Sequence, residues 1–441
     1  MKVISQFLFV LISMQILYGC KSSVKQKTFD AGIIRQCNKK LTDVIVVDIF
    51  TPPVAARMYA YSNIAAFEVL VNEYSNYKSL AGQVKDLKDI PKPEKNLSYD
   101  FSLASAIAFS TVARKTVYSE FEFSDFEKHL LDSAKIIGTD EKVILNSQQY
   151  GEQVGQAILK WMMKDNFAAS RKNTRYALLN KPGSWIPTPP DYMDAIEPYW
   201  NTIRTFVIDS PSLFLAPRPY EFDTITSTDF YKMAKTVYDT TNMLTGEQKQ
   251  IALYWDDNPF VSETAGHLKF FNKKTTPTGH WMNIVSLSSK IKNLNIMETS
   301  ELYTLTAMAM HDGFVACWDE KYRSNLIRPV SYINLYIDRS WKTFLQTPPF
   351  PEYTSGHSTI SATAAQVLTL LIGDTVSFTD SSQVEYGFPV RSFKTFHDAS
   401  AECSISRVYG GIHYMPACTE GRIMGKKIGE YVVRKIQTKV K

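Results

Sequence analysis

Three short clusters in the last third of the chain combine cationic side chains with histidine. The first is "KYRSNLIRP", which contains Lys321 and Arg328. These residues are two helical turns apart, so their side chains can point the same way along a helix. We expect Pro329 to end that helix, because proline cannot continue the backbone hydrogen-bond pattern.

The other two clusters each pair small residues with a histidine. The stretch "PPFPEYTSGHS" is a Pro-rich turn that leads into Ser355, Gly356 and His357, at the start of a helical run of small residues. The stretch "SRVYGGIH" contains Arg407 and His413, with two adjacent glycines between them. Glycine tolerates unusual backbone angles, so this pair suits a sharp bend.

Taken together, these residue types can enclose an oxyanion. One lysine and two arginines supply permanent positive charge and many N–H donors. Ser355 adds a hydroxyl, and Gly356 lets its backbone N–H approach a ligand without a Cβ in the way. A cage needs only donors, so the two histidines indicate reactivity, one as ligand or nucleophile and the other as acid or base.

Taken singly, each cluster has an ordinary interpretation. A lone cation is usually a solvated surface charge, Ser-Gly-His is usually a turn, and a lone histidine is usually structural. Nearby, His311, Asp312 and Glu402 can either orient a cage residue from behind or be ordinary helix-surface or capping charges. What favours a site is the occurrence of all three clusters in one order.

The ordered set resembles the signature of the vanadium-dependent haloperoxidases and of the related acid phosphatases in the type-2 phosphatidic-acid phosphatase superfamily. That pattern is Lys, six residues, Arg-Pro; then Ser-Gly-His; then Ser-Arg, five residues, His. The matching residues are Lys321, Arg328-Pro329, Ser355-Gly356-His357, Ser406-Arg407 and His413. Thr354 stands where the family usually has proline.

The resemblance implies a vanadate cofactor and a role for each matched residue. His413 would bond to vanadium, and His357 would contact the apical oxygen and manage protons. The equatorial oxygens would be held by Lys321, Arg328, Ser355, Gly356 and Arg407. Hydrogen peroxide bound there would become electrophilic, and a halide would attack it to give hypohalous acid.

Two other functions stay open at this point. The same cage suits phosphate, and an acid phosphatase would form a phosphohistidine at His413 while His357 protonates the leaving group of a phosphomonoester. Trp318 and Phe350 match aromatic residues on the halide side of the chloroperoxidase pocket, which favours the haloperoxidase, although both can be plain core residues. A surface lipoprotein that only binds a ligand would need neither histidine.

The hydrophobic pattern predicts an all-α fold of helical bundles, of the vanadium haloperoxidase and acid phosphatase type, with long irregular loops. We expect helices over 53–74, 102–117, 141–165, 245–257, 299–322, 357–372 and 417–436. The last carries glycines at every fourth position, Gly421, Gly425 and Gly429, which permits close helix contact. Residues 168–225 are rich in Pro, Tyr and Trp and read as a long functional loop.

The N-terminus reads as a bacterial lipoprotein signal over residues 1–19. Leu17-Tyr18-Gly19-Cys20 resembles a lipobox, so Cys20 would be lipidated; the alternative is an ordinary signal peptide with an incidental cysteine. A tether over 20–42, an N-terminal helical region over 43–294 and a catalytic helical core over 295–436 would follow. The protein would then sit in the bacterial cell envelope, anchored to the membrane by lipid and facing the periplasm or the cell surface.

The amino-acid composition further narrows the class of protein to which the chain can belong. The chain has 441 residues, 44% hydrophobic and 21% charged, with a formal net charge of +5, which fits a globular protein and does not indicate nucleic acid. The cysteines after Cys20 show no CxxC and no metal-type spacing, so we predict no zinc site, and their disulfide pairing stays open. Multiple membrane-spanning segments, typical of the lipid phosphatases in the superfamily, are absent from the pattern.

Overall fold

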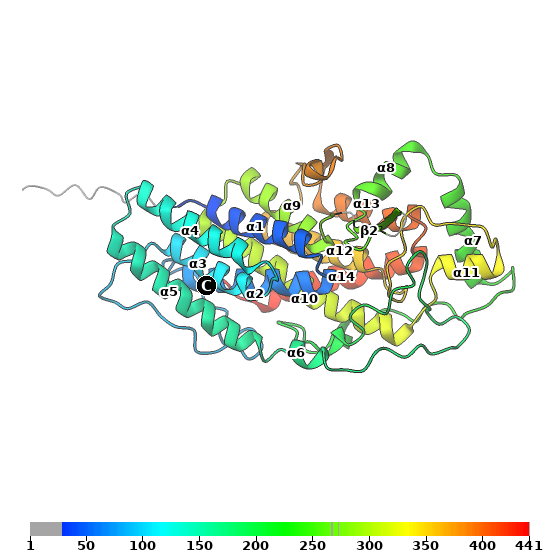
Figure 1. Cartoon of the computed structure of the whole chain (residues 1–441), viewed down its shortest axis with the longest axis horizontal. Helices are drawn as coiled ribbons and strands as arrows, with labels where there is room; N and C mark the ends of the chain where they lie inside the picture. Colours follow the sequence, from blue (N-terminus) through cyan, green and yellow to red (C-terminus); the bar gives the residue numbers. More distant parts are fainter. Residues whose placement is uncertain (1–28, 266–267, 272, 441) are drawn as a thin grey trace, which may run out of the picture.

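The computed structural model describes residues 29–265, 268–271 and 273–440, so Cys20 and the predicted signal lie outside the described residues. Helices dominate the described part, which is elongated (Figure 1), and the all-α prediction is confirmed. The first eight are α1 (Gly32–Asp48), α2 (Pro52–Leu70), α3 (Phe101–Arg114), α4 (Glu120–Ile136), α5 (Glu141–Met162), α6 (Phe167–Ser170), α7 (Asp229–Asn242) and α8 (Gly246–Tyr254). The others are α9 (Pro277–Ile291), α10 (Ile296–Ser324), α11 (Pro329–Tyr336), α12 (Gly356–Ile372), α13 (Phe396–Tyr409) and α14 (Met415–Lys435).

Short elements complete the described chain. Two antiparallel hairpins pair β1 (Ser262–Ala265) with β2 (Leu268–Phe271), and β3 (Phe378–Asp380) with β4 (Arg391–Phe393). Single 3-10 turns are η1 (Trp200–Thr202), η2 (Pro211–Phe214) and η3 (Val384–Tyr386). The sequence did not predict these hairpins, because strands of three or four residues are too short to show an alternating pattern.

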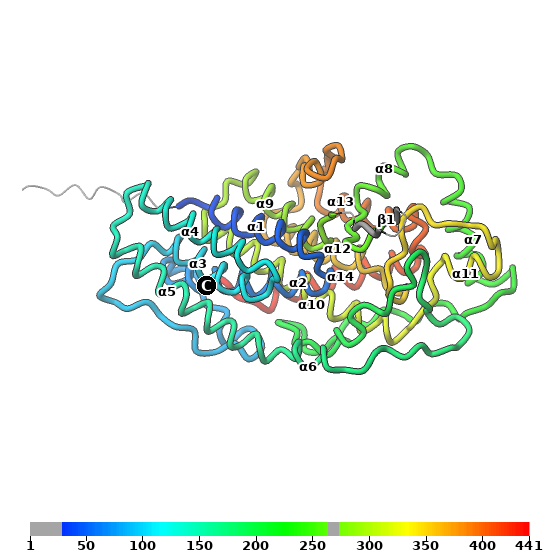
Figure 2. The backbone as a smooth tube through the Cα atoms, in the orientation of Figure 1, coloured from blue at the N-terminus to red at the C-terminus, as the bar shows by residue number. Residues whose placement is uncertain are grey.

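The long helix α10 forms the centre of the molecule. It packs against α2 on one side and against α12 and α14 on another, and Figure 2 shows these helices following the long axis. Helices α2, α3 and α5 form one packed group, and α12, α13 and α14 form a second. Every residue of α2 is buried, as expected for a helix that is apolar on all sides.

Two predictions about helix boundaries are wrong. Residues 20–42 were expected to be a tether, but α1 begins at Gly32 and buries one face in the core, because Ile33, Ile34 and Cys37 recur at helical spacing. Lys321 and Arg328 do not share a helix. Helix α10 ends where Asn325 adopts a left-handed backbone conformation at φ 46°, and Pro329 opens α11 instead of ending a helix.

The excursion over 168–225 is ordered and runs along the lower edge in Figure 2. Its main anchor is Asp312 of α10, whose carboxylate accepts hydrogen bonds from the backbone N–H groups of Phe206, Val207 and Ile208 at 2.7, 2.8 and 3.0 Å. Burial raises the pKa of Asp312 to about 6. Asp312 therefore anchors this loop through three backbone amides.

Helices α12 and α14 touch backbone to backbone through the glycine ridge. A Cβ added at Gly421 would lie 2.9 Å from the Ser355 carbonyl oxygen, and one added at Gly425 would lie 2.1 Å from that of Thr359. At Gly429 the nearest atom would be the Thr363 carbonyl oxygen, at 2.7 Å. The ridge thus presses α14 against the helix that carries the Ser-Gly-His cluster.

We predict that Gly425→Ala lowers the free energy of unfolding by about 1–3 kcal/mol, because the methyl meets backbone that cannot move aside. Gly246→Ala is the matched control: it opens α8, and a Cβ there meets no atom within 4 Å. Thermal unfolding followed by circular dichroism should show a lower midpoint for the first variant and an unchanged or higher one for the second. A Gly425→Ala protein as stable as wild type would contradict this packing.

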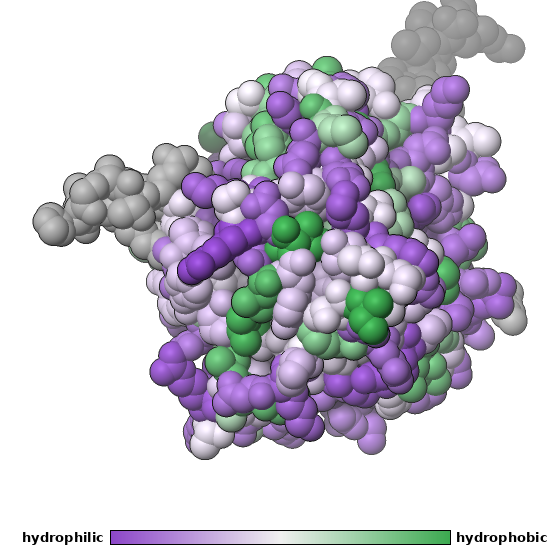
Figure 3. Space-filling view, turned by 90° about the vertical axis from the view of Figure 1, so that its right-hand side faces the viewer, coloured by the Kyte–Doolittle hydropathy of each residue, from purple (hydrophilic) through white to green (hydrophobic). Residues whose placement is uncertain are grey.

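Three further features concern the hydropathy of one surface, the state of the cysteines and the length of the apolar helices. At the end of the molecule that faces the viewer in Figure 3, hydrophobic residues form small patches separated by polar ones. Cys37, Cys317, Cys403 and Cys418 are buried and unpaired. Among the described helices, none is long and apolar enough to cross a membrane.

Candidate active site

Ser355 and Gly356 lie where helix α12 begins. Ser355 is the N-cap residue, and its hydroxyl accepts a hydrogen bond from the backbone N–H of Ser358 at 3.3 Å. Gly356 is the first helical residue, where an α-helix leaves its backbone N–H without an intrahelical partner. A Cβ on Gly356 would lie 3.4 Å from the ring of Trp318. The helix start predicted at Ser-Gly-His is therefore present, and the N–H group of Gly356 is not used within the helix.

His413 lies in the bend between α13 and α14. Gly411 supplies that bend with a φ of 73°, as the two glycines predicted. The ring Nδ1 is 2.8 Å from Glu352 Oε1, which also accepts from the backbone N–H of Tyr414 at 2.9 Å. A carboxylate partner at Nδ1 keeps the proton there, so Nε2 carries a free lone pair.

Sequence reasoning missed Glu352, although it lies inside the quoted Pro-rich stretch. Burial raises the pKa of its carboxyl to about 7, and its Oε2 has no hydrogen-bond partner in the described part of the chain. A single carboxylate within the apolar run "PPFPEY" was the available signal, because an acidic residue among buried neighbours needs a specific partner.

Arg328 contacts the other nitrogen of the His413 ring. Its Nη1 lies 3.2 Å from His413 Nε2 and also donates to the Ile412 carbonyl at 2.7 Å, while Nε donates to the Phe350 carbonyl at 2.8 Å. Nη2 is buried and has no partner among the described residues. Burial lowers the pKa of Arg328 to about 10, so the guanidinium stays charged at neutral pH.

Arg407 approaches the other histidine. Its Nη1 lies 3.5 Å from His357 Nε2, and its Nη2 donates to the Trp255 carbonyl at 2.6 Å. Burial, followed by the charge of Arg407, holds the pKa of His357 well below its usual range. Each arginine thus uses part of its guanidinium to bind a backbone carbonyl and directs another part to a histidine.

Lys321 is completely buried beneath the Pro-rich turn. Its ammonium donates to the backbone carbonyls of Pro351 at 3.0 Å and Glu352 at 3.1 Å, and to that of Thr354. These three bonds use all three N–H groups of a lysine. Burial lowers the pKa of Lys321 to about 7. Lys321 therefore supports the turn that leads into Ser355. When protonated, it also adds positive charge to the site without a free N–H group.

Trp318 and Phe350 lie against the cationic groups. Their ring centroids are 5.0 Å apart, Lys321 Nζ lies 5.0 Å from the Phe350 centroid, and the Arg328 guanidinium carbon is also 5.0 Å from it. Trp318 Nε1 donates to the Ile196 carbonyl of the long excursion at 3.2 Å. Both rings are buried, yet they form one wall of the cluster and are not remote core residues.

The predicted residues converge on one place. Burial lowers the pKa of His413 well below its usual range, and the charges of Arg328, Lys321, Arg407 and His357 lower it further. Contacts connect the clusters: Arg328 lies 3.2 Å from the His413 ring, and Arg407 lies 3.5 Å from the His357 ring. Lys321 and Arg328 both lie against the ring of Phe350, at 5.0 Å from its centroid. The three clusters, spread over about ninety residues of sequence, therefore form one cationic site with two neutral imidazoles.

A second buried cluster lies behind Arg407, and the sequence did not assign it. His280 Nδ1 is 3.0 Å from Asp257 Oδ2, and His280 Nε2 is 2.8 Å from Asp380 Oδ2. Burial alone would lower the pKa of His280, but the two carboxylates outweigh it and raise the pKa to about 10. The ring stacks on Trp255 at 4.4 Å, which fixes the segment whose carbonyl binds Arg407.

The other candidates lie outside the cage. His311 Nε2 bonds to the Arg204 carbonyl at 3.1 Å, and burial lowers its pKa to about 4. Glu402 binds Arg391 at 2.7 Å and accepts from Trp255 Nε1 at 3.0 Å. Both therefore stabilise neighbouring loops.

Comparisons with known proteins agree with this fold. The chain is similar to a bacterial vanadium-dependent iodoperoxidase of known structure, with a TM-score of 0.88 and 41% identity over 94% of this chain and 98% of that one. It shares its fold with the holo form of a bacterial vanadium-dependent chloroperoxidase, with a TM-score of 0.68 and 17% identity over 88% of this chain and 94% of that one. Residues 336–441 match the family model described as "VCPO second helical-bundle domain". No curated protein matches the chain significantly.

This similarity in fold and sequence identifies the chain as an enzyme with peroxidase activity. The chain belongs to the vanadium-dependent haloperoxidase family.

Proposed function

We propose that this protein oxidises halide with hydrogen peroxide at a vanadate bonded to Nε2 of His413. The observation that carries the proposal is the pair formed by His413 and Arg328. The bare ring nitrogen lies 3.2 Å from a guanidinium whose Nη2 is buried without a partner in the described chain. An unpaired buried N–H is costly, and an oxyanion bound at the ring nitrogen would satisfy it.

The donor set fits vanadate in charge and chemistry. Arg328, Arg407, the Ser355 hydroxyl and the Gly356 N–H would hold its oxygens, with His357 on the remaining side. Vanadate, when bound, supplies a Lewis-acidic centre that activates hydrogen peroxide towards a halide. Glu352 holds the proton on Nδ1 and keeps Nε2 available as a ligand. His357 is neutral when the cage is empty and can accept a proton from incoming peroxide.

Lys321 has a more indirect role in this scheme than the family pattern implies. All three of its N–H groups are bound to backbone carbonyls of the turn, so a direct contact with the anion would require it to release one of them. Its charge still favours an anion, and a bound anion in turn favours the charged ammonium over the neutral amine.

We further propose iodide as the halide that is oxidised most readily. Iodide gives up electrons more easily than bromide or chloride, and the 41%-identical relative is described as an iodoperoxidase. The rings of Trp318 and Phe350 offer a polarisable apolar wall next to the cations, which suits a large, weakly hydrated anion. Measured kcat/KM values should therefore fall from iodide to bromide to chloride.

The test compares the two chemistries that the cage permits. The purified protein is stripped of bound anion and assayed with peroxide and each halide, with and without vanadate. Hydrolysis of p-nitrophenyl phosphate is assayed in parallel without vanadate. Halide oxidation that requires vanadate supports the proposal. Phosphate-ester hydrolysis that vanadate inhibits, without halide oxidation, would show a phosphatase that works through a phosphohistidine.

We also propose that the mature protein begins at a lipidated Cys20 and is anchored in the bacterial cell envelope, facing the periplasm or the cell surface. The proposal rests on the lipobox-like sequence before Cys20. Mass spectrometry of the mature N-terminus should find a diacylglyceryl-cysteine, and Cys20→Ala should move the protein from the membrane fraction to the soluble fraction. An unmodified N-terminus at another residue would exclude the anchor.

A further inference from the structure

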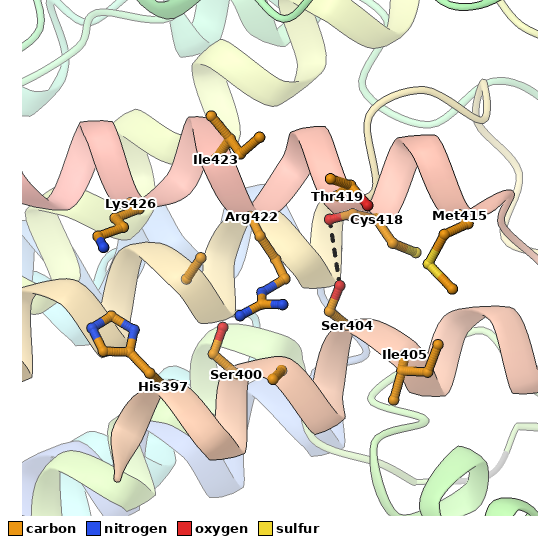
Figure 4. A pocket seen from close by; sticks show the side chains of 12 residues that line it. His397, Ser400, Ser404, Ile405, Met415, Cys418, Thr419, Arg422, Ile423 and Lys426 are labelled. Carbon is orange, nitrogen blue, oxygen red and sulfur yellow. Dashed lines mark hydrogen bonds between the residues drawn. The ribbon is translucent and has the colours of Figure 1, made fainter.

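A surface pocket lies on the side of α12 that is shared with α13 and α14. It has a volume of about 290 Å³, and Figure 4 shows the side chains that line it. Ser404 of α13 lies at its inner wall and contacts the Cys418 carbonyl of α14 at 3.4 Å, the dashed line in Figure 4. The Ser404 side chain is almost completely buried, so it connects the pocket to the interior between the helices.

A chain of hydroxyl groups leads from this pocket to the cage. Ser404 Oγ lies 2.8 Å from Ser358 Oγ, and Ser358 Oγ donates to Ser355 Oγ at 2.9 Å. Ser358 and Ser355 are fully buried. The family pattern includes Ser355 alone, and the roles proposed above use neither Ser358 nor Ser404.

The number of hydrogens and lone pairs on each serine hydroxyl determines which hydroxyl donates to which. A serine hydroxyl has one hydrogen and two lone pairs. Ser355 Oγ accepts from both the N–H and the O–H of Ser358, so its two lone pairs are filled and only its hydrogen is left to donate. Ser358 has spent its hydrogen on Ser355, so the 2.8 Å contact with Ser404 requires the single hydrogen of Ser404. The Cys418 carbonyl, at 3.4 Å, then shares that hydrogen only as the longer and weaker contact.

The neighbouring thiol does not reverse this direction. Cys418 lies beside Ser355 and Ser358, and burial raises the pKa of its thiol to about 12. It therefore stays neutral, and a neutral thiol is only a weak donor and a weak acceptor.

We propose that Ser358, with Ser404 behind it, is a positioning residue that makes the Ser355 hydroxyl a pure hydrogen-bond donor towards the oxyanion in the cage. The inference deepens the proposed function and rests on it. An anion binds donors and repels lone pairs, so a hydroxyl whose lone pairs are already occupied is prepared for it before it arrives. Successive hydroxyls also polarise one another, which strengthens the last donor.

The chain offers a matched control one turn further along the same helices. Ser361 of α12 and Ser400 of α13 form the same kind of contact, at 3.1 Å, and both are buried. Ser361 also donates to the Ser358 backbone carbonyl at 3.3 Å. Within the described part of the structure no hydrogen bond joins the side chains of this pair to Ser355, so Ser361→Ala removes an equivalent hydroxyl without disturbing the proposed series of hydroxyls.

The experiment measures the affinity of the vanadate-free protein for orthovanadate by equilibrium dialysis, independently of turnover. Ser358→Ala should weaken binding about 3- to 10-fold and Ser404→Ala about twofold, in line with the loss of one buried hydrogen bond. Ser361→Ala should bind like wild type. Ser404→Thr should restore binding, because it keeps the hydroxyl and its methyl can occupy the pocket.

A double-mutant cycle separates positioning from packing. In a Ser355→Ala background, Ser358→Ala should have no further effect on vanadate affinity, because the group through which it acts is already gone. A Ser358→Ala effect that persists in that background, or that equals the effect of Ser361→Ala, would overturn the inference while leaving the proposed function intact. A wild-type protein that binds no vanadate would overturn both.

Discussion

Replacing His413 with alanine should reduce halide oxidation at least about a thousandfold, the largest effect we expect from any single substitution. In the proposed function this residue supplies the ligand nitrogen, and Glu352, bound to Nδ1 on the other side of the ring, keeps Nε2 free of a proton. Alanine removes the ligand and also leaves the Glu352 carboxylate buried with one partner fewer, which adds to the loss. The measurements are vanadate-dependent iodide oxidation and vanadate affinity, on the same preparation.

His357→Ala is the control for this prediction, because it should lower turnover without removing the vanadate ligand. His357 Nε2 lies 3.5 Å from Arg407 Nη1, and in our scheme this histidine moves protons. Its loss should lower kcat about 10²- to 10⁴-fold, the usual contribution of a general acid or base, and leave vanadate affinity largely intact. Complete loss of vanadate binding in His357→Ala would reverse the two assignments.

Glu352→Gln tests the carboxylate that binds Nδ1 of His413 while leaving the histidine itself in place. The amide is similar in size, but it cannot accept the Nδ1 proton as strongly as a carboxylate, so vanadate affinity should fall about 10- to 100-fold, as is typical when the residue behind a ligating histidine is changed. The variant should still bind vanadate at high concentration, unlike His413→Ala. Equal behaviour of the two variants would mean that Glu352 stabilises the fold of the bend and does not tune the ring.

The second large effect should come from Arg328→Met, which keeps an unbranched apolar stem but removes the guanidinium and its charge. The Nη2 of Arg328 is buried and has no partner among the described residues, so it is available to an incoming oxyanion. Charge-assisted hydrogen bonds contribute about 1.5–3 kcal/mol each, and the loss of one or two of them should weaken vanadate binding about 10²- to 10³-fold. Isothermal titration calorimetry with vanadate measures this directly.

Arg328→Lys is the control for charge alone. Lysine restores the cation, but it cannot bind the Phe350 and Ile412 carbonyls and the anion in one plane as the guanidinium does. Its affinity should therefore fall between those of wild type and Arg328→Met. If Arg328→Met binds vanadate as tightly as wild type, the oxyanion is held elsewhere, and the proposed cage is wrong.

Much of the fold was predictable because it depends on local pattern. The helix predicted over 245–257 contains α8, which Thr245 and Gln248 cap, and the small-residue run after His357 forms α12. Helices α1 and α13 were not predicted, and the end of α10 was misjudged, because a helix of mixed polarity is decided by what it packs against. Asn325 in a left-handed conformation ends α10 before Arg328, although proline seemed the stronger stop signal.

The sequence by itself determined which chemical groups are present and their local settings: the cations, the two histidines, the hydroxyl and glycine at a helix start, and the glycines of the bend. Only the tertiary structure decided how they are connected. Glu352 reaches the ring of His413 across 61 residues, Arg328 reaches it across 85, and Lys321 turns to backbone carbonyls. Such pairings have no sequence period, since burial forces each polar atom to find whichever partner the packed helices bring near.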